Sequence, residues 1–270
     1  MTVTIEKTEF VWTIILDRPE VRNAVDQVTR VSLQSAFDEF EGDVKARVAV
    51  LWGKGGHFCS GADLKAMSDP SKRKIIDPEG KGSGPMGPTR SQLTKPIIAA
   101  VAGYAVAGGL ELALWCDMRV AEKDAVFGVY CRRWGVPLID GGTVRLPRLV
   151  GHSRAMDMIL TGRPVKADEA LLIGLANRVV EQGGSRSAAE SLANEIASFP
   201  QECMKADRKS TVNQWSLSME EALQVEGKAA YSILEREAFA GAERFASGRG
   251  RGGRFDDHNN EAPLIKNNLV

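Results

Sequence analysis

Hydrophobic residues in the first half of the chain occur in short continuous runs, separated by polar or glycine-containing turns. Runs of this length are typical of buried strands, because helices of globular proteins are usually longer. The predicted strands are 3–5, 10–16, 47–52, 97–102 and 118–121. Helical patterns separate several of them, so the chain is predicted to form a layered α/β core.

One helix is predicted directly after the first pair of strands. Asp26 is a residue type that caps helix N-termini, and the hydrophobic residues after it recur at helical spacing. These residues are Val28, Val31, Phe37 and Phe40. We expect this face of the helix to pack on the sheet.

The pattern changes twice further along the chain. Residues 68–91 are polar and rich in Gly, Pro and Lys, which predicts a mobile loop that covers part of the molecule or is partly disordered. After Gly183 the pattern is helical as far as Phe245. We therefore predict an α/β core over residues 1–199 and a helical C-terminal region over 200–270, used for oligomerisation.

The composition excludes several functional classes. Lys plus Arg and Asp plus Glu both number 35, so no net charge favours nucleic acid or an anionic membrane. The apolar stretch 97–116 contains Glu111 and three glycines, which favours a buried strand and helix over a membrane span. The apolar run 10–16 is short and has acidic neighbours, unlike a signal peptide.

The four cysteines show neither paired spacing nor the spacing of a zinc site. Reduced thiols in a cytoplasmic compartment are the expected state, and no metal site is predicted.

Two glycine-containing turns, 58–65 and 103–112, each lead from a strand into a helix. The first N–H groups of a helix have no partner within it, and the helix dipole adds partial positive charge there. Two such N–H groups directed at one point would form an oxyanion hole, in which one donor is worth about 3–4 kcal/mol. Each turn taken alone is equally consistent with an ordinary strand–helix junction.

Glu111 follows Gly108 by about one helical turn. A carboxylate beside a polarised carbonyl is the natural base for a proton on the adjacent carbon. Glu111 is therefore the first candidate for acid–base chemistry.

Both turns resemble those of the crotonase superfamily, also called the enoyl-CoA hydratase/isomerase family, and they occur in the same order. The turn Phe58-Cys59-Ser60-Gly61-Ala62-Asp63-Leu64-Lys65 matches the family pattern F-x-A/S-G-A-D-I/L-K. Further similarity lies at 17–24, 116–117, 127–128, 141–147 and 160–162, so the resemblance covers roughly residues 5–185. It implies a crotonase-type spiral of repeated β-β-α units with a helical C-terminal subdomain.

The resemblance also implies the roles of several residues. Ala62 and Gly108 would donate their N–H groups to the oxygen of an acyl-CoA thioester, and Glu111 matches the first catalytic glutamate of hydratases. The coenzyme A moiety would lie along two segments, with the candidate contacts Arg22, Ala24, Ser60, Ala62, Asp63, Leu64 and Lys65. No cofactor beyond this coenzyme A is implied, and the expected assembly is a homotrimer or a dimer of trimers.

One position departs from the hydratase pattern. Cys131 stands where the second glutamate is expected, and a neutral thiol is a poor substitute for a carboxylate. Asp140 resembles the aspartate of the D-x-G-T segment in dienoyl-CoA isomerases, so Glu111 and Asp140 form the candidate acid–base pair. Asp140 is equally consistent with a residue that caps the next helix. Enoyl-CoA hydratase is the leading activity, with enoyl- or dienoyl-CoA isomerase as the alternative.

Two other functional classes stay open. The Arg-Gly tract at 248–254 is of a kind that binds RNA, although it is short and the protein is neutral. A coenzyme A-binding protein without turnover is the other alternative.

Overall fold

A computed structural model describes residues 1–248. The chain divides into two compact units within helix α7 (Ser185–Ser198): the first is Met1–Ala193, and the second begins at Asn194. The domain boundary predicted between residues 199 and 200 falls just beyond this helix, while the two units divide after Ala193. Most of the Arg-Gly tract lies outside the described residues.

A six-stranded sheet forms the centre of the first unit. Its order is β1 (Val3–Lys7), β2 (Val11–Leu16), β3 (Val48–Gly53), β4 (Ile97–Val101), β6 (Met118–Glu122) and β9 (Arg178–Val180). The β1–β2 pair is antiparallel and the other pairs are parallel. Parallel strands covered on both faces consist of continuous apolar runs, and all six residues of β2 are buried. The predicted strands are confirmed.

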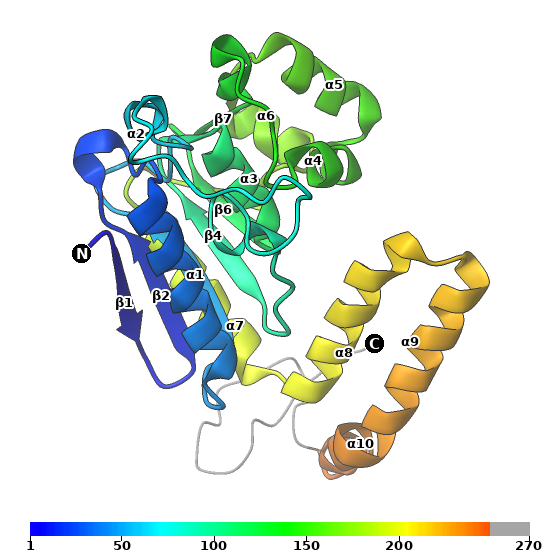
Figure 1. Ribbon diagram of the computed structural model, residues 1–270. Coiled ribbons are helices and arrows are strands. Elements are labelled where there is room, and N and C mark those ends of the chain that lie inside the picture. The colour runs from blue at the N-terminus through cyan, green and yellow to red at the C-terminus, as the bar shows by residue number, and fades with distance from the viewer. Residues whose placement is uncertain (249–270) are drawn as a thin grey trace. The chain divides into compact units, whose positions relative to one another are not determined.

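Helices cover both faces of this sheet. Helix α1 (Gln27–Gly42) lies along one face (Figure 1), and Phe40 packs against Trp12 of β2 with ring centroids 5.8 Å apart. The opposite side of the same strand carries Thr13, whose hydroxyl donates to Glu190 of α7 over 2.8 Å. Successive side chains of a strand point to opposite faces, so α1 and α7 lie on different sides.

The start of α1 is as predicted, but the predicted face is partly wrong. Asp26 caps the helix by accepting a hydrogen bond from the N–H of Thr29 at 2.8 Å. Val28 and Val31, however, are 63% and 50% exposed. The buried positions are Thr29, Leu33, Ala36, Phe37 and Phe40. The helix thus buries Leu33, Phe37 and Phe40, and it leaves the two valines exposed.

A second, three-stranded sheet contains β5 (Tyr104–Val106), β7 (Val126–Gly128) and β8 (Val165–Lys166). Strands β4 and β5 lead into helix α3 (Gly108–Trp115), while β6 and β7 lead through a 3-10 helix at Tyr130–Trp134 into α4 (Gly142–Val150). These repeats confirm the predicted crotonase-type α/β fold. The remaining helices are α2 (Leu64–Ser68), α5 (His152–Thr161) and α6 (Ala167–Leu172), with short 3-10 turns at Pro19–Val21 and Pro88–Arg90.

The segment 68–91, predicted to be a mobile loop, is buried near its C-terminal end. Residues 84–89 are buried, with Met86 only 1% exposed. Arg30 of α1 holds this end, because its guanidinium donates to Ser83 Oγ at 2.8 Å and to the carbonyl of Gly84 at 2.9 Å. For residues 84–89, burial and these hydrogen bonds contradict the expectation of a mobile or partly disordered loop.

The second unit is helical, as expected. It contains α8 (Gln201–Asn213), a 3-10 turn at Gln214–Ser216, α9 (Met219–Ile233), a π-helical turn at Leu234–Ala238 and α10 (Phe239–Ala246). Helices α8 and α9 run side by side in opposite directions (Figure 1). Large apolar side chains remain exposed on this unit, namely Trp215, Met219, Leu223, Tyr231 and Phe239. Within residues 1–248, no helix is both long enough and apolar enough to cross a membrane.

Candidate active site

The two glycine-containing turns lie against each other. The N–H of Cys59 donates to the carbonyl of Tyr104 at 2.9 Å, and the N–H of Val106 donates to the carbonyl of Cys59 at 3.1 Å. Gly61 has a φ of +96°, and a Cβ added there would lie 2.9 Å from the backbone nitrogen of Gly108. A Cβ on Gly109 would lie 2.0 Å from the carbonyl oxygen of Cys59. Only glycine allows the two backbones to approach this closely.

This approach brings the two predicted N–H donors to one cavity, which we call the chamber. Ala62 and Gly108 both line it. Neither backbone N–H donates a hydrogen bond to another group among residues 1–248. An unpaired N–H is costly when it is buried away from water, and helix α3 begins at Gly108, where partial positive charge accumulates. Two unpaired donors beside one cavity are suited to an anionic oxygen.

Glu111 also lines the chamber, and its side chain is fixed by main-chain groups. Its Oε1 accepts hydrogen bonds from the N–H of Asp140 at 2.9 Å and from the N–H of Gly142 at 2.8 Å. A Cβ on Gly142 would lie 2.9 Å from the same oxygen, so the position leaves no room for a side chain. Both main-chain bonds use Oε1, which leaves Oε2 for a ligand.

Burial changes the acidity of Glu111. The residue is 2% exposed, and loss of hydration, followed by the nearby charge of Asp140, raises the pKa of its carboxyl group to about 7. The two main-chain hydrogen bonds act in the opposite direction but do not cancel the effect of burial. A pKa near neutrality suits a group that both accepts and returns a proton.

Asp140 is a second buried carboxylate in the chamber, 3% exposed. Its Oδ1 accepts the N–H of Met86 at 2.9 Å and the hydroxyl of Thr89. Asp140 does not cap the following helix, because the N-cap position of α4 is Gly141 and no side chain bonds there. The structure thus brings together Glu111 and Asp140, the pair proposed from the sequence.

The remaining chamber walls are mostly apolar, and the cavity measures about 140 Å³. The apolar residues are Ala66, Met67, Ile76, Pro85, Met86, Val136, Pro137 and Ile139. Residues 72–74 add cationic side chains to this lining. A space below the range of drug-sized sites suits a small group beside the two N–H donors.

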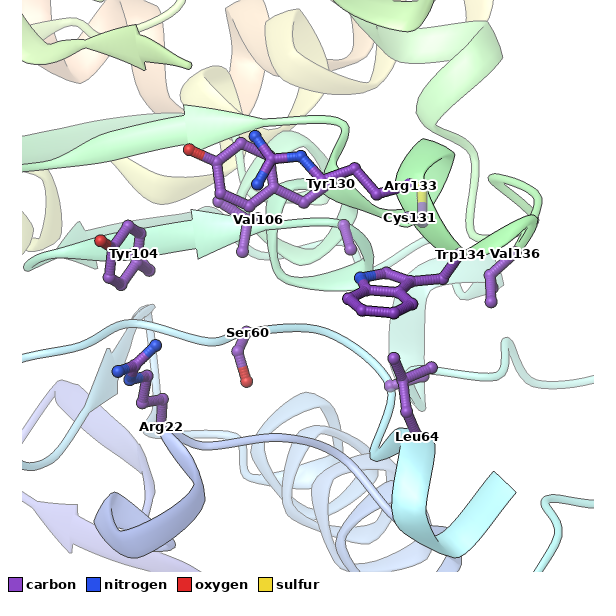
Figure 2. Close-up of a pocket in the computed structure, with 12 residues that line it drawn as sticks. Arg22, Ser60, Leu64, Tyr104, Val106, Tyr130, Cys131, Arg133, Trp134 and Val136 are labelled. Atoms are coloured by element: carbon purple, nitrogen blue, oxygen red, sulfur yellow. The ribbon is translucent and has the colours of Figure 1, made fainter. Parts of the chain in front are cut away.

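A second and larger cavity of about 350 Å³ adjoins the chamber, and both are lined by Ala62 and Val136. We call it the groove. Figure 2 shows Arg22, Ser60 and Leu64 on one wall, with Tyr104, Tyr130, Arg133 and Trp134 facing them from the other. Two arginine–tyrosine pairs lie in it: the guanidinium carbon of Arg133 is 3.9 Å from the ring centroid of Tyr130, and that of Arg22 is 5.5 Å from Tyr104. Cations and aromatic rings of this kind suit a phosphorylated ligand.

The residues predicted to bind coenzyme A fall into three groups. Arg22, Ser60, Ala62 and Leu64 line the groove. Asp63 lines the chamber instead, where it caps α2 and pairs with Arg18 at 3.1 Å. Ala24 and Lys65 line neither the groove nor the chamber within the described chain.

Several residues that line these cavities are not among the site residues predicted from the sequence. Tyr130, Arg133 and Trp134 lie on one short 3-10 helix, so their clustering in sequence was an available signal. Lys74 and Val136 carry no motif, and only the folded chain places them beside Glu111.

Cys131 lies on the groove side, separate from the carboxylates of the chamber. It is 6% exposed, and burial together with the charge of Glu111 raises the pKa of its thiol. The thiol is therefore neutral at physiological pH, as an inert buried cysteine would be. In residues 1–248 no three His, Cys, Asp or Glu side chains cluster as a metal site, and all four cysteines are free thiols.

Comparison with known proteins agrees with this geometry. The family model described as enoyl-CoA hydratase/isomerase matches residues 6–250. The chain belongs to the enoyl-CoA hydratase/isomerase family. The short-chain-enoyl-CoA hydratase of Clostridium acetobutylicum is 34% identical and is matched over 84% of this chain and 87% of its own. The enoyl-CoA hydratase EchA19 of Mycobacterium tuberculosis is also 34% identical, over 87% of this chain and 90% of its own.

Solved structures of the enoyl-CoA hydratase/isomerase family share the fold. A crystal structure of an enoyl-CoA hydratase from Mycobacterium tuberculosis H37Rv superposes with a TM-score of 0.85 at 34% identity. The superposition covers 92% of this chain and 96% of that one. This chain is thus an enzyme of the enoyl-CoA hydratase/isomerase family over nearly its whole length.

Proposed function

We propose that this enzyme is an enoyl-CoA hydratase, which adds water across the double bond of a 2-enoyl-CoA thioester. The observation that carries the proposal is the meeting of three groups in one chamber: the unpaired N–H groups of Ala62 and Gly108, and the buried carboxylate of Glu111. The same chamber holds Asp140, the carboxylate that we propose substitutes for the second hydratase glutamate, whose sequence position is taken by Cys131.

The two N–H groups act on the thioester oxygen. When water attacks the β-carbon, the electrons of the double bond move toward the thioester and negative charge develops on that oxygen. Donors already positioned by the fold stabilise this charge without rearranging during the reaction, and each is worth a factor of about 10²–10³ in rate. The tight contact between Gly61 and Gly108 keeps the two donors at a fixed separation.

Glu111 moves the proton. Its Oε2 accepts a proton from water as the water oxygen bonds to the β-carbon, and it delivers that proton to the α-carbon of the enolate. The carboxylate is then restored, and one water molecule has been added in total. Asp140 orients the attacking water by accepting a hydrogen bond from its second hydrogen, which stays on the oxygen. The main-chain N–H of Asp140 orients Glu111.

The groove suits the coenzyme A part of the substrate. Its arginines, Arg22 and Arg133, supply charge-assisted hydrogen bonds to phosphate oxygens, and Trp134, 69% exposed, offers a flat apolar surface. The chamber adjoins the groove at Ala62, so the thioester lies where the two cavities meet. This reaction needs no cofactor beyond the coenzyme A of the substrate.

One observation favours a second candidate, an enoyl-CoA isomerase. Cys131 stands at the second glutamate position, and Glu111 and Asp140 are two carboxylates in one chamber. Such a pair can remove a proton from one carbon and return it to another without adding water.

Kinetics with crotonyl-CoA tests the proposal. Loss of the absorbance of the conjugated thioester, with 3-hydroxybutyryl-CoA as product, is the expected result. Conversion of a 3-enoyl-CoA to the conjugated isomer, without hydration of crotonyl-CoA, would contradict the hydratase activity and support the isomerase activity. Tight binding of acyl-CoA, without turnover of crotonyl-CoA or of the 3-enoyl-CoA, would indicate a coenzyme A-binding protein without catalysis.

We also propose a homotrimer or a dimer of trimers in which the helices from residue 194 onward pack between subunits. Among described residues of this unit, only Ala197 and Ile233 are buried hydrophobic side chains, and an apolar surface of this kind is typical of an interface, which supports the proposal. Sedimentation equilibrium should give three or six times the 29.3 kDa mass of one chain. A monomer at micromolar concentration would contradict the proposal. The free thiols favour a reducing compartment such as the cytoplasm.

A further inference from the structure

Lys74 contributes an ammonium group to the chamber, although no motif of the sequence marks it. The residue lies between α2 and the buried segment 84–89, and it lines the chamber together with Glu111 and Asp140. The only hydrogen bond of Lys74 Nζ within residues 1–248 goes to the Sδ of Met86, over 3.6 Å. A thioether is a weak acceptor, whereas an ammonium carries three donors.

The carboxylates around Lys74 are engaged with other partners. Asp26 pairs with Arg18 at 3.2 Å, and Asp140 accepts from Met86 and Thr89. Glu111 accepts two main-chain N–H groups. No ion pair of the described chain includes Lys74, in contrast to Lys72, which pairs with Asp69 at 3.2 Å. The ammonium of Lys74 thus has unused donors in a partly apolar cavity.

The surroundings of Lys74 make this arrangement unfavourable when nothing is bound. Loss of hydration lowers the pKa of Lys74 to about 8, and the charge of Asp140 opposes this effect. The amine is still mostly protonated at neutral pH. A cation that has lost part of its hydration and has only a thioether as hydrogen-bond acceptor attracts an anion strongly, because a partly apolar site strengthens the interaction.

The side chain of Met86 contacts Lys74 and also lies close to Gly108, so it shows how near the ammonium is to the predicted oxyanion hole. The Sδ that touches Lys74 Nζ lies only 2.6 Å from the point where a Cβ of Gly108 would sit. One thioether group therefore separates the ammonium from the predicted oxyanion donor. An anionic group that binds Lys74 would belong to the acyl chain, a few bonds beyond the thioester carbonyl.

We propose that Lys74 selects the substrate by binding a carboxylate at the distal end of a short acyl chain. The proposal rests on the hydratase function above and defines its substrate class as a CoA thioester of a short enedioic acid. A plain alkyl chain in the same place would remove the remaining water from Lys74 and offer no partner, so the chamber discriminates against it.

Binding of saturated thioesters tests the inference independently of turnover. The matched pair is pentanedioyl-CoA and pentanoyl-CoA, which differ in a terminal carboxylate against a methyl group, with the six-carbon pair as a second length. Calorimetry should show the carboxylated member binding about tenfold to hundredfold tighter to the wild-type enzyme. Equal affinities within both pairs would overturn the role of Lys74.

Two variants assign any preference to Lys74. Lys74→Met keeps the length of the side chain without its charge, so it should abolish the preference and strengthen binding of the alkyl member. Lys81→Met is the matched control, because Lys81 is exposed in the same segment and lines neither cavity. A preference that survives in Lys74→Met, or is lost equally in Lys81→Met, would contradict the proposal.

Turnover then separates this inference from the proposed function. Hydration of pent-2-enedioyl-CoA with a kcat/KM about tenfold or more above that of pent-2-enoyl-CoA supports both proposals. Hydration of the two at equal rates overturns the selection by Lys74 and leaves the hydratase intact. Selective binding of pentanedioyl-CoA, with no hydration of either enoyl thioester, supports carboxylate binding by Lys74 and contradicts the proposed hydratase activity.

Discussion

The chamber and the groove adjoin each other but hold their charges in different ways. In the chamber, Glu111 and Asp140 are almost completely buried, and main-chain N–H groups fix their oxygens. In the groove, Arg22 and Arg133 are exposed and contact mainly aromatic rings. Fixed buried groups are suited to stabilising a transition state, and exposed cations to holding a large polar ligand.

This difference predicts that the two cavities affect different kinetic constants. Substitutions in the chamber should lower kcat, since the interactions they remove are strongest in the transition state. Substitutions in the groove should raise KM and leave kcat nearly unchanged, because the coenzyme A moiety is bound equally before and during the reaction.

The largest expected effect is that of Glu111→Gln. The amide keeps the size of the side chain but cannot take a proton from water, so kcat should fall about 10²–10⁴-fold with little change in acyl-CoA binding. Steady-state kinetics together with calorimetry would measure both. In the wild type, kcat/KM should decline below about pH 7, where Glu111 becomes protonated. Undiminished turnover of the variant would exclude Glu111 as the base.

Gly61→Ala should have the next largest effect. Its added Cβ would meet the backbone nitrogen of Gly108 at 2.9 Å, at a φ of +96° that disfavours a side chain. Separation of the two N–H donors should lower kcat about 10²–10³-fold. Circular dichroism and thermal melting would show whether the variant is folded. Normal kcat in a folded variant would contradict the fixed pair of donors.

A comparison of Asp140→Asn with Cys131→Ala tests which cavity contains the second acid–base group. We expect Asp140→Asn to lower kcat about 10–100-fold, since the water loses its second acceptor. Cys131→Ala should change kcat less than about threefold, because that thiol stays neutral in the groove. A larger loss of kcat in Cys131→Ala than in Asp140→Asn, measured with crotonyl-CoA, would assign the second acid–base role to Cys131 in the groove.

Burial of Glu111 should also affect stability. Its pKa in the folded protein, about 7, exceeds the usual 4.5, so the folded state retains a proton that the unfolded chain releases between these pH values. This contribution is complete below pH 4.5 and is lost as pH rises through 7. Glu111→Gln should therefore be more stable than the wild type at pH 8 by about 3 kcal/mol. Urea unfolding at pH 8 and pH 4 would measure it, and an equal difference at both pH values would contradict it.

The smallest effect should come from the groove. Arg133→Ala and Arg22→Ala should each raise KM about three- to tenfold at unchanged kcat, and added salt should reduce the difference from the wild type. A tenfold loss of kcat in either variant would contradict the prediction that the groove affects KM and the chamber affects kcat. Arg148→Ala offers a control on the same unit, since Arg148 lines neither cavity.

Much of the fold was predictable because the relevant signals are local. Continuous apolar runs mark strands that are buried on both faces, and Asp26 marks the start of α1. The face of α1 was harder to predict, since Val28 and Val31 are hydrophobic yet exposed, while Thr29 and Ala36 are buried. Helical spacing fixes which residues share a face but not which face meets the sheet.

In the candidate active site too, relations within one helix could be predicted from the sequence, but contacts between distant segments could not. Glu111 and Gly108 lie on one helix, so their relation could be inferred from spacing. Asp140 reaches Glu111 through its own N–H, and Lys74 reaches the chamber from a segment without motif or periodicity. Such placements depend on contacts between distant segments, which a single sequence does not display.

The contact between the two glycine turns also has a consequence for biosynthesis. Gly61 lies early in the chain, but its partners at Gly108 and Gly109 belong to a helix that is translated much later. A nascent polypeptide that has emerged only as far as the first turn can form a strand and a helix, but not the amide pair. The site therefore cannot be complete before residues 108–142 have left the exit tunnel, since Glu111 also needs the N–H groups of Asp140 and Gly142.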